Sequence, residues 1–305
     1  PAARARVDAL ADQLARERGL HVAGEVAEAA ALADEVAVGA DAAGYAPLAI
    51  EAALWQAETR TAAGRIDDAR GLARRAFDLA VAGSDPRSAA VAAADLAQLG
   101  AYDPAHAADA IGWVRTGERL IARLDGALEL AGRLAAAEGN LAVAAGAPAA
   151  AAAALDRAIA TYRRLDPEHP SLGSLLGARG SAALDHGDVA GAERALGEAV
   201  RRIERDLGAD HPELAAAWIN LALVLGARGD YAAAIALTDR ALALQRRALG
   251  GDHPALAYAY LARAQLESAR GDRARAVDDL ARGEQRVRDG LGAGYPLAAT
   301  IAMAQ

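Results

Sequence analysis

The chain has 305 residues, of which 54% are hydrophobic and 24% are charged, and its formal net charge is −8. The charges are spread along the chain and form no basic stripe, so a nucleic-acid partner is not expected. Disulfides and thiolate metal sites are excluded because there is no cysteine, and membrane insertion is not expected because the best apolar stretch, 141–155, is shorter than the ~20 residues needed to span a bilayer.

Four helix–turn–helix units are predicted in the first half of the chain, over residues 3–42, 44–84, 86–124 and 126–166. Gly24, Gly64 and Gly146 resemble the turns within the first, second and fourth units, and an alanine follows each of them five residues later. A small residue at that place lets the two helices of a unit approach closely. The third unit is less regular, because residues 101–104 replace the glycine turn.

A strict repeat of 42 residues marks the second half of the chain. Each repeat carries a Gly-Asp pair, a Leu-Gly pair and a dipeptide of His or Tyr with Pro, and all three keep the same register. The dipeptides are His169-Pro170, His211-Pro212, His253-Pro254 and Tyr295-Pro296; the Gly-Asp pairs begin at Gly187, Gly229 and Gly271; the Leu-Gly pairs begin at Leu207, Leu249 and Leu291.

Each landmark of the repeat has a role at a helix end. Proline at the first helical position costs no hydrogen bond, glycine after leucine suits a helix C-terminus, and Gly-Asp combines a helix stop with an N-cap. Strand signals are absent. We therefore predict an all-α fold, a right-handed superhelical solenoid of antiparallel helix pairs with about seven units. Its expected parts are divergent repeats over 1–166, regular repeats over 167–295, and an eighth unit or capping helix over 296–305.

The regular repeats resemble a known family. Trp218 and Tyr260 share one position of the first helix, and Ala222 and Ala264 share another. This pattern resembles the consensus of the tetratricopeptide repeat (TPR). The spacing of 42 residues, with joints of the LGADHP and LGGDHP type, is similar to the kinesin-light-chain-like TPR subfamily over residues 167–296. The resemblance implies a protein-binding module in which the first helix of each unit lines a concave groove.

The resemblance also implies which residues line that groove. Asn220 matches the family's asparagine that hydrogen-bonds a bound peptide backbone, and an amide can donate and accept at once. The alternative is an asparagine that is merely tolerated on an exposed helix. Capture of a C-terminal carboxylate is not expected, because Tyr258 and Ala262 stand where such TPRs carry Lys or Arg. The predicted lining is Arg133, Asn140, Ser174, Ser181, Ile219, Asn220, Leu223, Tyr258, Leu261 and Gln265.

No catalytic residue, cofactor or metal site is predicted. His169, His211 and His253 are one repeat apart, so a solenoid spreads them along its edge instead of bringing them together, and no HExxH spacing occurs. No Gly-x-Ser-x-Gly motif is present, and the glycines of 290–294 belong to a joint between repeats. An enzyme whose site the sequence does not reveal is the least favoured alternative.

The composition bears on the biological setting. Every basic residue is arginine, and alanine and glycine are abundant, which indicates a GC-rich bacterial gene. With its TPR pattern, the chain resembles the C-terminal TPR region of bacterial, myxobacterial-type serine/threonine protein kinases. We therefore expect a non-enzymatic, cytoplasmic scaffold that binds a protein or peptide partner and is part of a larger signalling protein. The alternative is the ligand- or peptide-sensing array of an ATP-dependent signalling or transcriptional regulator. An HRD and DFG pair before Pro1 would favour the first, and GxxxxGK[ST] the second.

Overall fold

The chain folds into α-helices joined by short turns. The computed structural model describes residues 2–22, 26–102 and 106–290, and these ranges contain fourteen α-helices, one short 3₁₀ helix and no β-strand. The predicted all-α class is therefore confirmed. The helices divide between two compact units, Pro1–Ala145 and Gly146–Gln305.

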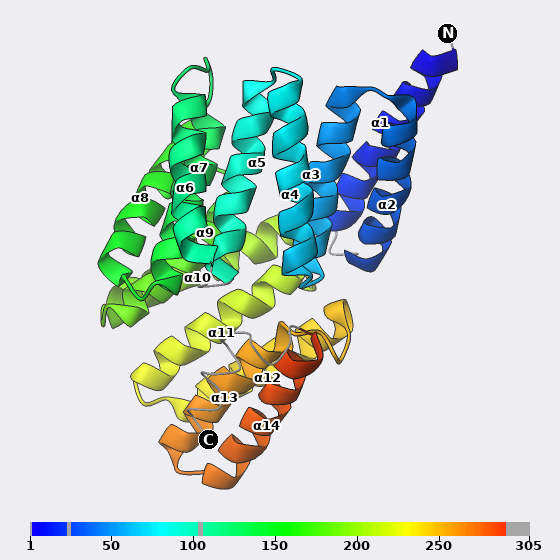
Figure 1. Ribbon diagram of the computed structural model, residues 1–305. Helices are drawn as coiled ribbons and strands as arrows, with labels where there is room; N and C mark the ends of the chain where they lie inside the picture. The colour runs from blue at the N-terminus through cyan, green and yellow to red at the C-terminus, as the bar shows by residue number, and fades with distance from the viewer. Residues whose placement is uncertain (1, 23–25, 103–105, 291–305) are drawn as a thin grey trace. The chain divides into compact units, whose positions relative to one another are not determined.

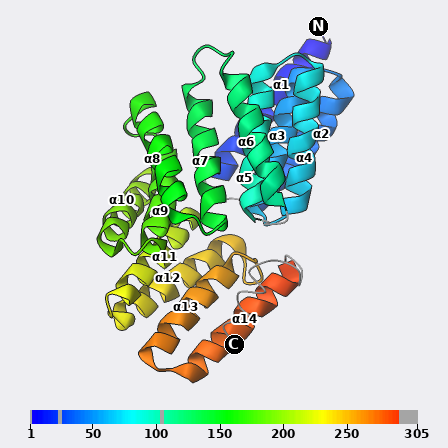
Figure 2. The same ribbon diagram turned by 60° about the vertical axis from the view of Figure 1, so that its left-hand side comes forward.

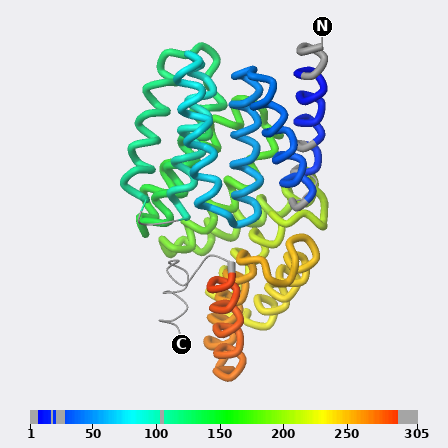
Figure 3. Tube along the Cα trace, turned by 45° about the vertical axis from the view of Figure 1, so that its right-hand side comes forward, coloured from blue at the N-terminus to red at the C-terminus, as the bar shows by residue number. Residues whose placement is uncertain are grey.

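The first unit consists of helical hairpins in which each helix packs against the next along the chain. Figure 1 shows α3, α4 and α5 side by side, and Figure 3 traces the same row in blue to green. Its elements are α1 (Ala2–Val22), α2 (Val26–Ala43), α3 (Ala46–Ala62), α4 (Ile66–Ala82), α5 (Pro86–Leu99), η1 (Gly100–Tyr102), α6 (Ala107–Ile121) and α7 (Leu128–Ala144).

The second unit repeats the hairpin with longer second helices. Figure 2 shows α11 to α14 as a row of neighbouring helices, and each of them packs against the next. Its elements are α8 (Pro148–Leu165), α9 (Ser171–Asp185), α10 (Val189–Leu207), α11 (Pro212–Ala227), α12 (Tyr231–Leu249), α13 (Leu256–Arg270) and α14 (Arg273–Gly290).

The boundary between the two units falls inside a predicted helix pair. Residues 126–166 were expected to form the fourth pair, but α7 belongs to the first unit and α8 to the second. The predicted boundary at 166/167 marks only where the sequence repeat becomes regular. The predicted element at 296–305 and the Gly24 turn lie outside the described residues.

The turns within the hairpins have the predicted backbone geometry. Gly229 has a φ of +84°, a region that side chains other than glycine's rarely enter, and Gly187 and Gly271 behave alike. The Asp230 side chain accepts a hydrogen bond from the Ala233 N–H at 3.2 Å and so caps α12. The same cap recurs at Asp188 and Asp272.

The joints between hairpins depart from the prediction in one respect. Pro212 begins α11 as expected, but Pro170 and Pro254 precede the first residues of α9 and α13. At all three joints Nδ1 of the histidine before the proline accepts the backbone N–H two residues further on, and at His211 this hydrogen bond caps α11. The distances are 3.2 Å for His169, 3.3 Å for His211 and 3.2 Å for His253.

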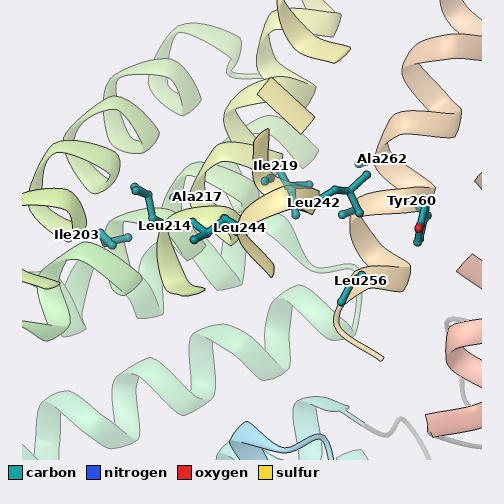
Figure 4. Close-up of a cluster of buried hydrophobic side chains, with 12 residues drawn as sticks. Ile203, Leu214, Ala217, Ile219, Leu242, Leu244, Leu256, Tyr260 and Ala262 are labelled. Carbon is teal, nitrogen blue, oxygen red and sulfur yellow. The ribbon is translucent and has the colours of Figure 1, made fainter. Parts of the chain in front are cut away.

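Alanine lets the helices approach closely in both units. The alanines five residues after the turn glycines, Ala69, Ala151, Ala192, Ala234 and Ala276, are all buried. The second unit adds larger side chains, and Figure 4 shows Leu214, Ile219, Leu242 and Leu244 gathered in one cluster of its core. Because the helices pack this closely, the first helix of each hairpin exposes a narrow stripe of side chains to solvent.

Candidate functional site

Asn220 and Tyr258 form a polar pair on the first helices of two successive hairpins. Asn220 lies on α11 and is half-buried, and Tyr258 lies in the first turn of α13 and is 38% exposed. The Tyr258 hydroxyl donates a hydrogen bond to Asn220 Oδ1 at 3.0 Å. Within the described residues, the Asn220 amide N–H groups have no partner and can donate to a ligand.

The surroundings of Tyr258 favour its neutral phenol. Burial by the surrounding protein and, second, the negative charge of Asp185 raise the pKa of Tyr258 to about 12, although the residue is 38% exposed. Burial also raises the pKa of Asp185, at the C-terminal end of α9. The phenol therefore stays protonated at neutral pH and keeps its hydrogen bond to Asn220.

Two predicted groove residues belong to the core instead. Ile219 is 0% exposed and Leu261 is 5% exposed, so neither side chain can contact a partner. Ile219 packs in the cluster of Figure 4, and Leu261 packs among α13 and α14 side chains that include Ala276 and Leu280. The prediction for these two residues is therefore wrong, because α11 and α13 are covered on most of their circumference.

The remaining predicted residues of the second unit are dispersed. Leu223 is half-buried against the same core, Ser181 is half-buried on α9, and Ser174 donates a hydrogen bond to Glu213 at 2.7 Å. Gln265 is exposed and lines a groove of about 650 Å³ between α13 and α14. Of the predicted set, Asn220 and Tyr258 are joined directly by a hydrogen bond.

Arg133 and Asn140 lie on α7 of the first unit, where both contact α5. Arg133 forms an ion pair with Asp95, and Asn140 Nδ2 donates to Gln98 Oε1 at 2.8 Å. Burial raises the pKa of Asp95, although the Arg133 guanidinium acts in the opposite direction.

Arg133 also lines a pocket that the sequence analysis missed. The pocket has a volume of about 380 Å³ and opens along stripes of α3, α5 and α7. The lining residues on α3 could have been predicted to share one helical face, because they recur at spacings of three or four residues. The pocket is lined by Pro47, Glu51, Leu54, Trp55, Glu58, Asp85, Ser88, Val91, Asp95 and Arg133, and we call it the first-unit pocket.

Other kinds of site find no support within the described ranges. No three His, Asp or Glu side chains in residues 2–22, 26–102 and 106–290 gather closely enough to hold a metal ion. None of the helices described there combines the length and apolar character needed to cross a bilayer.

The fold and the polar pair define an α-helical repeat protein with an accessible stripe along its first helices. Residues 174–213 and 213–289 each match a family model described as tetratricopeptide repeat. This part of the chain is thus a TPR array, as the repeat predicted. No curated protein matches the chain in sequence.

Solved structures resemble the chain at low sequence identity. A Rap protein complexed with competence and sporulation factor has 14% identity and a TM-score of 0.65, over 97% of this chain and 85% of its own. BtubC (BKLC) from P. vanneervenii has 18% identity and a TM-score of 0.54, over 77% and 92%. Putative kinesin light chain repeats from Podosopora anserina have 22% identity and a TM-score of 0.45, over 65% and 95%. The first two structures, with TM-scores above 0.5, share the fold of this chain, and sequence identities this low show the fold alone.

Proposed function

We propose that the chain is a scaffold that binds an extended polypeptide along the first helices of its repeats. The observation that carries the proposal is the Asn220–Tyr258 pair, which presents amide donors and a partly exposed phenol on the TPR array. A buried peptide group that lacks a hydrogen-bond partner costs about 1–3 kcal/mol, so a peptide-binding surface needs such groups. Tyr258 adds apolar area with a hydroxyl, a combination common at interface anchors.

The proposal is tested by selecting binders from a displayed random peptide library and measuring their affinity for three proteins. The parent chain, Asn220→Ala and Arg247→Ala are compared by isothermal titration calorimetry. Arg247 is a suitable control because its side chain is 64% exposed and forms a surface ion pair with Asp210, whose side chain is 89% exposed.

We expect Asn220→Ala to weaken binding by roughly 1–3 kcal/mol, or about 5- to 150-fold in Kd, while the control keeps its affinity. Unchanged melting curves would show that the fold is intact. The proposal fails if Asn220→Ala binds fully and Arg247→Ala does not, because the partner would then dock on the second helices.

The finer assignment concerns the protein to which this array belongs. We propose the non-catalytic TPR region, of kinesin-light-chain-like type, of a larger cytoplasmic bacterial signalling protein such as a serine/threonine kinase. The arginine-only basic composition and the repeat pattern support it. The encoded sequence before Pro1 tests it: an HRD and DFG pair is expected, and a different catalytic or binding domain would overturn it.

A ligand-sensing array is the second candidate. The observation that favours it is the fold shared with a Rap protein that was solved with competence and sporulation factor bound. In that case a GxxxxGK[ST] motif is expected in the full-length protein, outside these residues. Both candidates use the same polypeptide- or ligand-binding face, and neither requires catalysis by the array itself.

A further inference from the structure

The groove of about 650 Å³ between α13 and α14 lies on the last hairpin that the structure describes, at the end of the row of helices in Figure 2. We call it the α13–α14 groove. Its floor is apolar, because Ala264, Ala276 and Leu280 line it and are all buried. Val277 and Arg273 of α14 line it as well, and both are exposed. Its volume lies within the range of ligand sites, about 300–1,000 Å³.

The two hairpins before it show what fills a groove of this kind. Val224 of α11 packs with Leu196 of α10 in the core of the preceding hairpin. Leu266 of α13 lies 42 residues after Val224 and packs with Ala234 and Ile235 of α12. In both cases the first helix of the next hairpin supplies one apolar side chain to the hairpin before it, as expected when repeats contact their neighbours.

The α13–α14 groove repeats the second of these arrangements in the same register. Ala276 and Val277 follow Ala234 and Ile235 by 42 residues. Ile235 is 8% exposed in its cluster with Leu266, whereas Val277 is 56% exposed. The groove is therefore shaped for a helix of the α13 type that presents a leucine.

The wall of the groove differs from its covered counterparts at one position. Val189 and Tyr231 hold this position in the two preceding hairpins, where each packs against the apolar cluster. Arg273 holds it here, and its side chain forms no ion pair or hydrogen bond with any part of the chain that the structure describes. Arginine is enriched at protein–protein interfaces. A free guanidinium favours an occupant with a carboxylate one helical turn from its leucine.

The segment 296–305 does not itself supply this leucine. In the register of 42 residues it corresponds to residues 254–263, which precede Leu266. The segment therefore includes no counterpart of the side chain that fills the covered groove between α11 and α12.

We propose that the α13–α14 groove binds an amphipathic α-helix of a partner polypeptide, which packs a leucine against Ala276 and Val277 and pairs a carboxylate with Arg273. Recognition of a helix in a groove uses anchors on one helical face in this way. The inference goes beyond the proposed function, because the groove is a second site whose lining includes neither Asn220 nor Tyr258.

The probe for the test is derived from α13, because Leu266 of this helix already fits a groove of the same kind. It is a fluorescein-labelled peptide with the sequence of residues 256–270 and the change Arg270→Glu, which places a carboxylate four residues after Leu266. A covalent staple holds it helical, because isolated helices of this length are marginal in water. Two comparison peptides carry the unchanged α13 sequence, or Leu266→Ala beside Arg270→Glu. Binding to the full chain is measured by fluorescence anisotropy.

The groove variant is Val277→Asp, which removes an apolar wall and places a carboxylate beside Arg273. Val81→Asp on α4 is the matched control, because Val81 and Val277 are both 56% exposed. We expect the groove variant to bind the probe at least ~10-fold more weakly than the parent, and the control to stay within ~3-fold of it. Leu266→Ala in the probe should likewise cost at least ~10-fold.

The charge of Arg273 is tested separately. The Arg270→Glu probe should bind up to ~5-fold more tightly than the unchanged α13 sequence, because exposed ion pairs are weak. Arg273→Gln should abolish this preference, and a preference that survives the change would contradict the pairing.

Several results would overturn the proposal. They are no binding of the probe to the parent, equal losses in Val277→Asp and Val81→Asp, and unchanged affinity of the Leu266→Ala probe, which decides the matter if Val277→Asp does not fold. Ile301→Pro prevents a helix over residues 296–305. Binding that appears only after this change would assign the groove to the chain's own segment. Self-association in sedimentation velocity that Val277→Asp abolishes would assign it to a second copy.

Asn220→Ala separates this inference from the proposed function. It should leave probe binding unchanged while it weakens the binding of library-selected peptides. If those peptides depend on Asn220 and the probe does not bind, the α13–α14 groove alone loses its assignment. If they ignore Asn220 and the probe binding depends on Val277, the Asn220–Tyr258 site loses its assignment instead.

Discussion

Replacing Ile219 with alanine tests whether this residue belongs to the core or to the groove. Ile219 is 0% exposed and packs in the cluster of Figure 4. The substitution removes three carbon atoms, and at about 0.8 kcal/mol per buried CH₂ the lost transfer free energy is about 2.4 kcal/mol. The cavity left behind adds to this, so the free energy of unfolding should fall by about 2–5 kcal/mol. An exposed groove residue would change it by no more than about 0.5 kcal/mol.

Urea unfolding followed by the helical circular dichroism signal measures this difference. Val277→Ala on α14 is the control, because Val277 is 56% exposed, and its unfolding midpoint should match that of the parent. Repeat arrays can unfold in more than one step, so the slope of each transition must be compared as well as its midpoint. Equal midpoints for Ile219→Ala and Val277→Ala, with peptide binding lost only in the first, would refute the core assignment.

Two further substitutions test local interactions. His211→Ala should destabilise the second unit by about 0.5–2 kcal/mol in the same urea assay, because the Glu213 N–H loses its cap, and His211→Asn should recover part of the loss; equal losses in the two variants would exclude a capping role. Arg133→Ala should cost about 1–3 kcal/mol at neutral pH, because Asp95 loses its cation. Burial already raises the folded-state pKa of Asp95 above its unfolded value of about 3.9. The raised pKa therefore contributes stability that is fully present below about pH 3.9, where Asp95 is protonated in both states, and that is lost as the pH rises through the folded-state pKa. Removing Arg133 raises the folded pKa further, so the deficit of the variant should shrink as the pH is lowered toward about 4, and a deficit that is constant with pH would contradict this.

The parts of the fold that were predictable from sequence depend on local backbone chemistry. A helix stop such as Gly229 followed by the cap Asp230 requires particular residues wherever it occurs, so its recurrence marks each hairpin turn. The division between α7 and α8 was not predictable in the same way. The Gly146 turn between them has a positive φ like the others, and the turn alone does not show which helices pack together.

The groove was predicted less well because α11 is enclosed on several sides. Its buried residues include Leu214, Ala217, Ile219, Ala222 and Val224, which spread over more than half of the helix circumference instead of forming one narrow stripe. Hydrophobic periodicity therefore could not separate Ile219 from its neighbour Asn220, although one is fully buried and the other is accessible. Aligning the repeats with a family's consensus identifies which helix lines the groove, but it does not identify which side of that helix stays exposed to solvent.

The first-unit pocket was missed for a different reason, which bears on specificity. Glu51, Asp95 and Arg133 are far apart in sequence, and carboxylates are so frequent in this chain that their spacing carries little information. These residues form a pocket only because the packing of α3, α5 and α7 brings them together. Because alanine packing leaves each first helix a narrow accessible stripe, a few side chains decide its chemistry. In the second unit they are an amide and a phenol, which suit a peptide backbone.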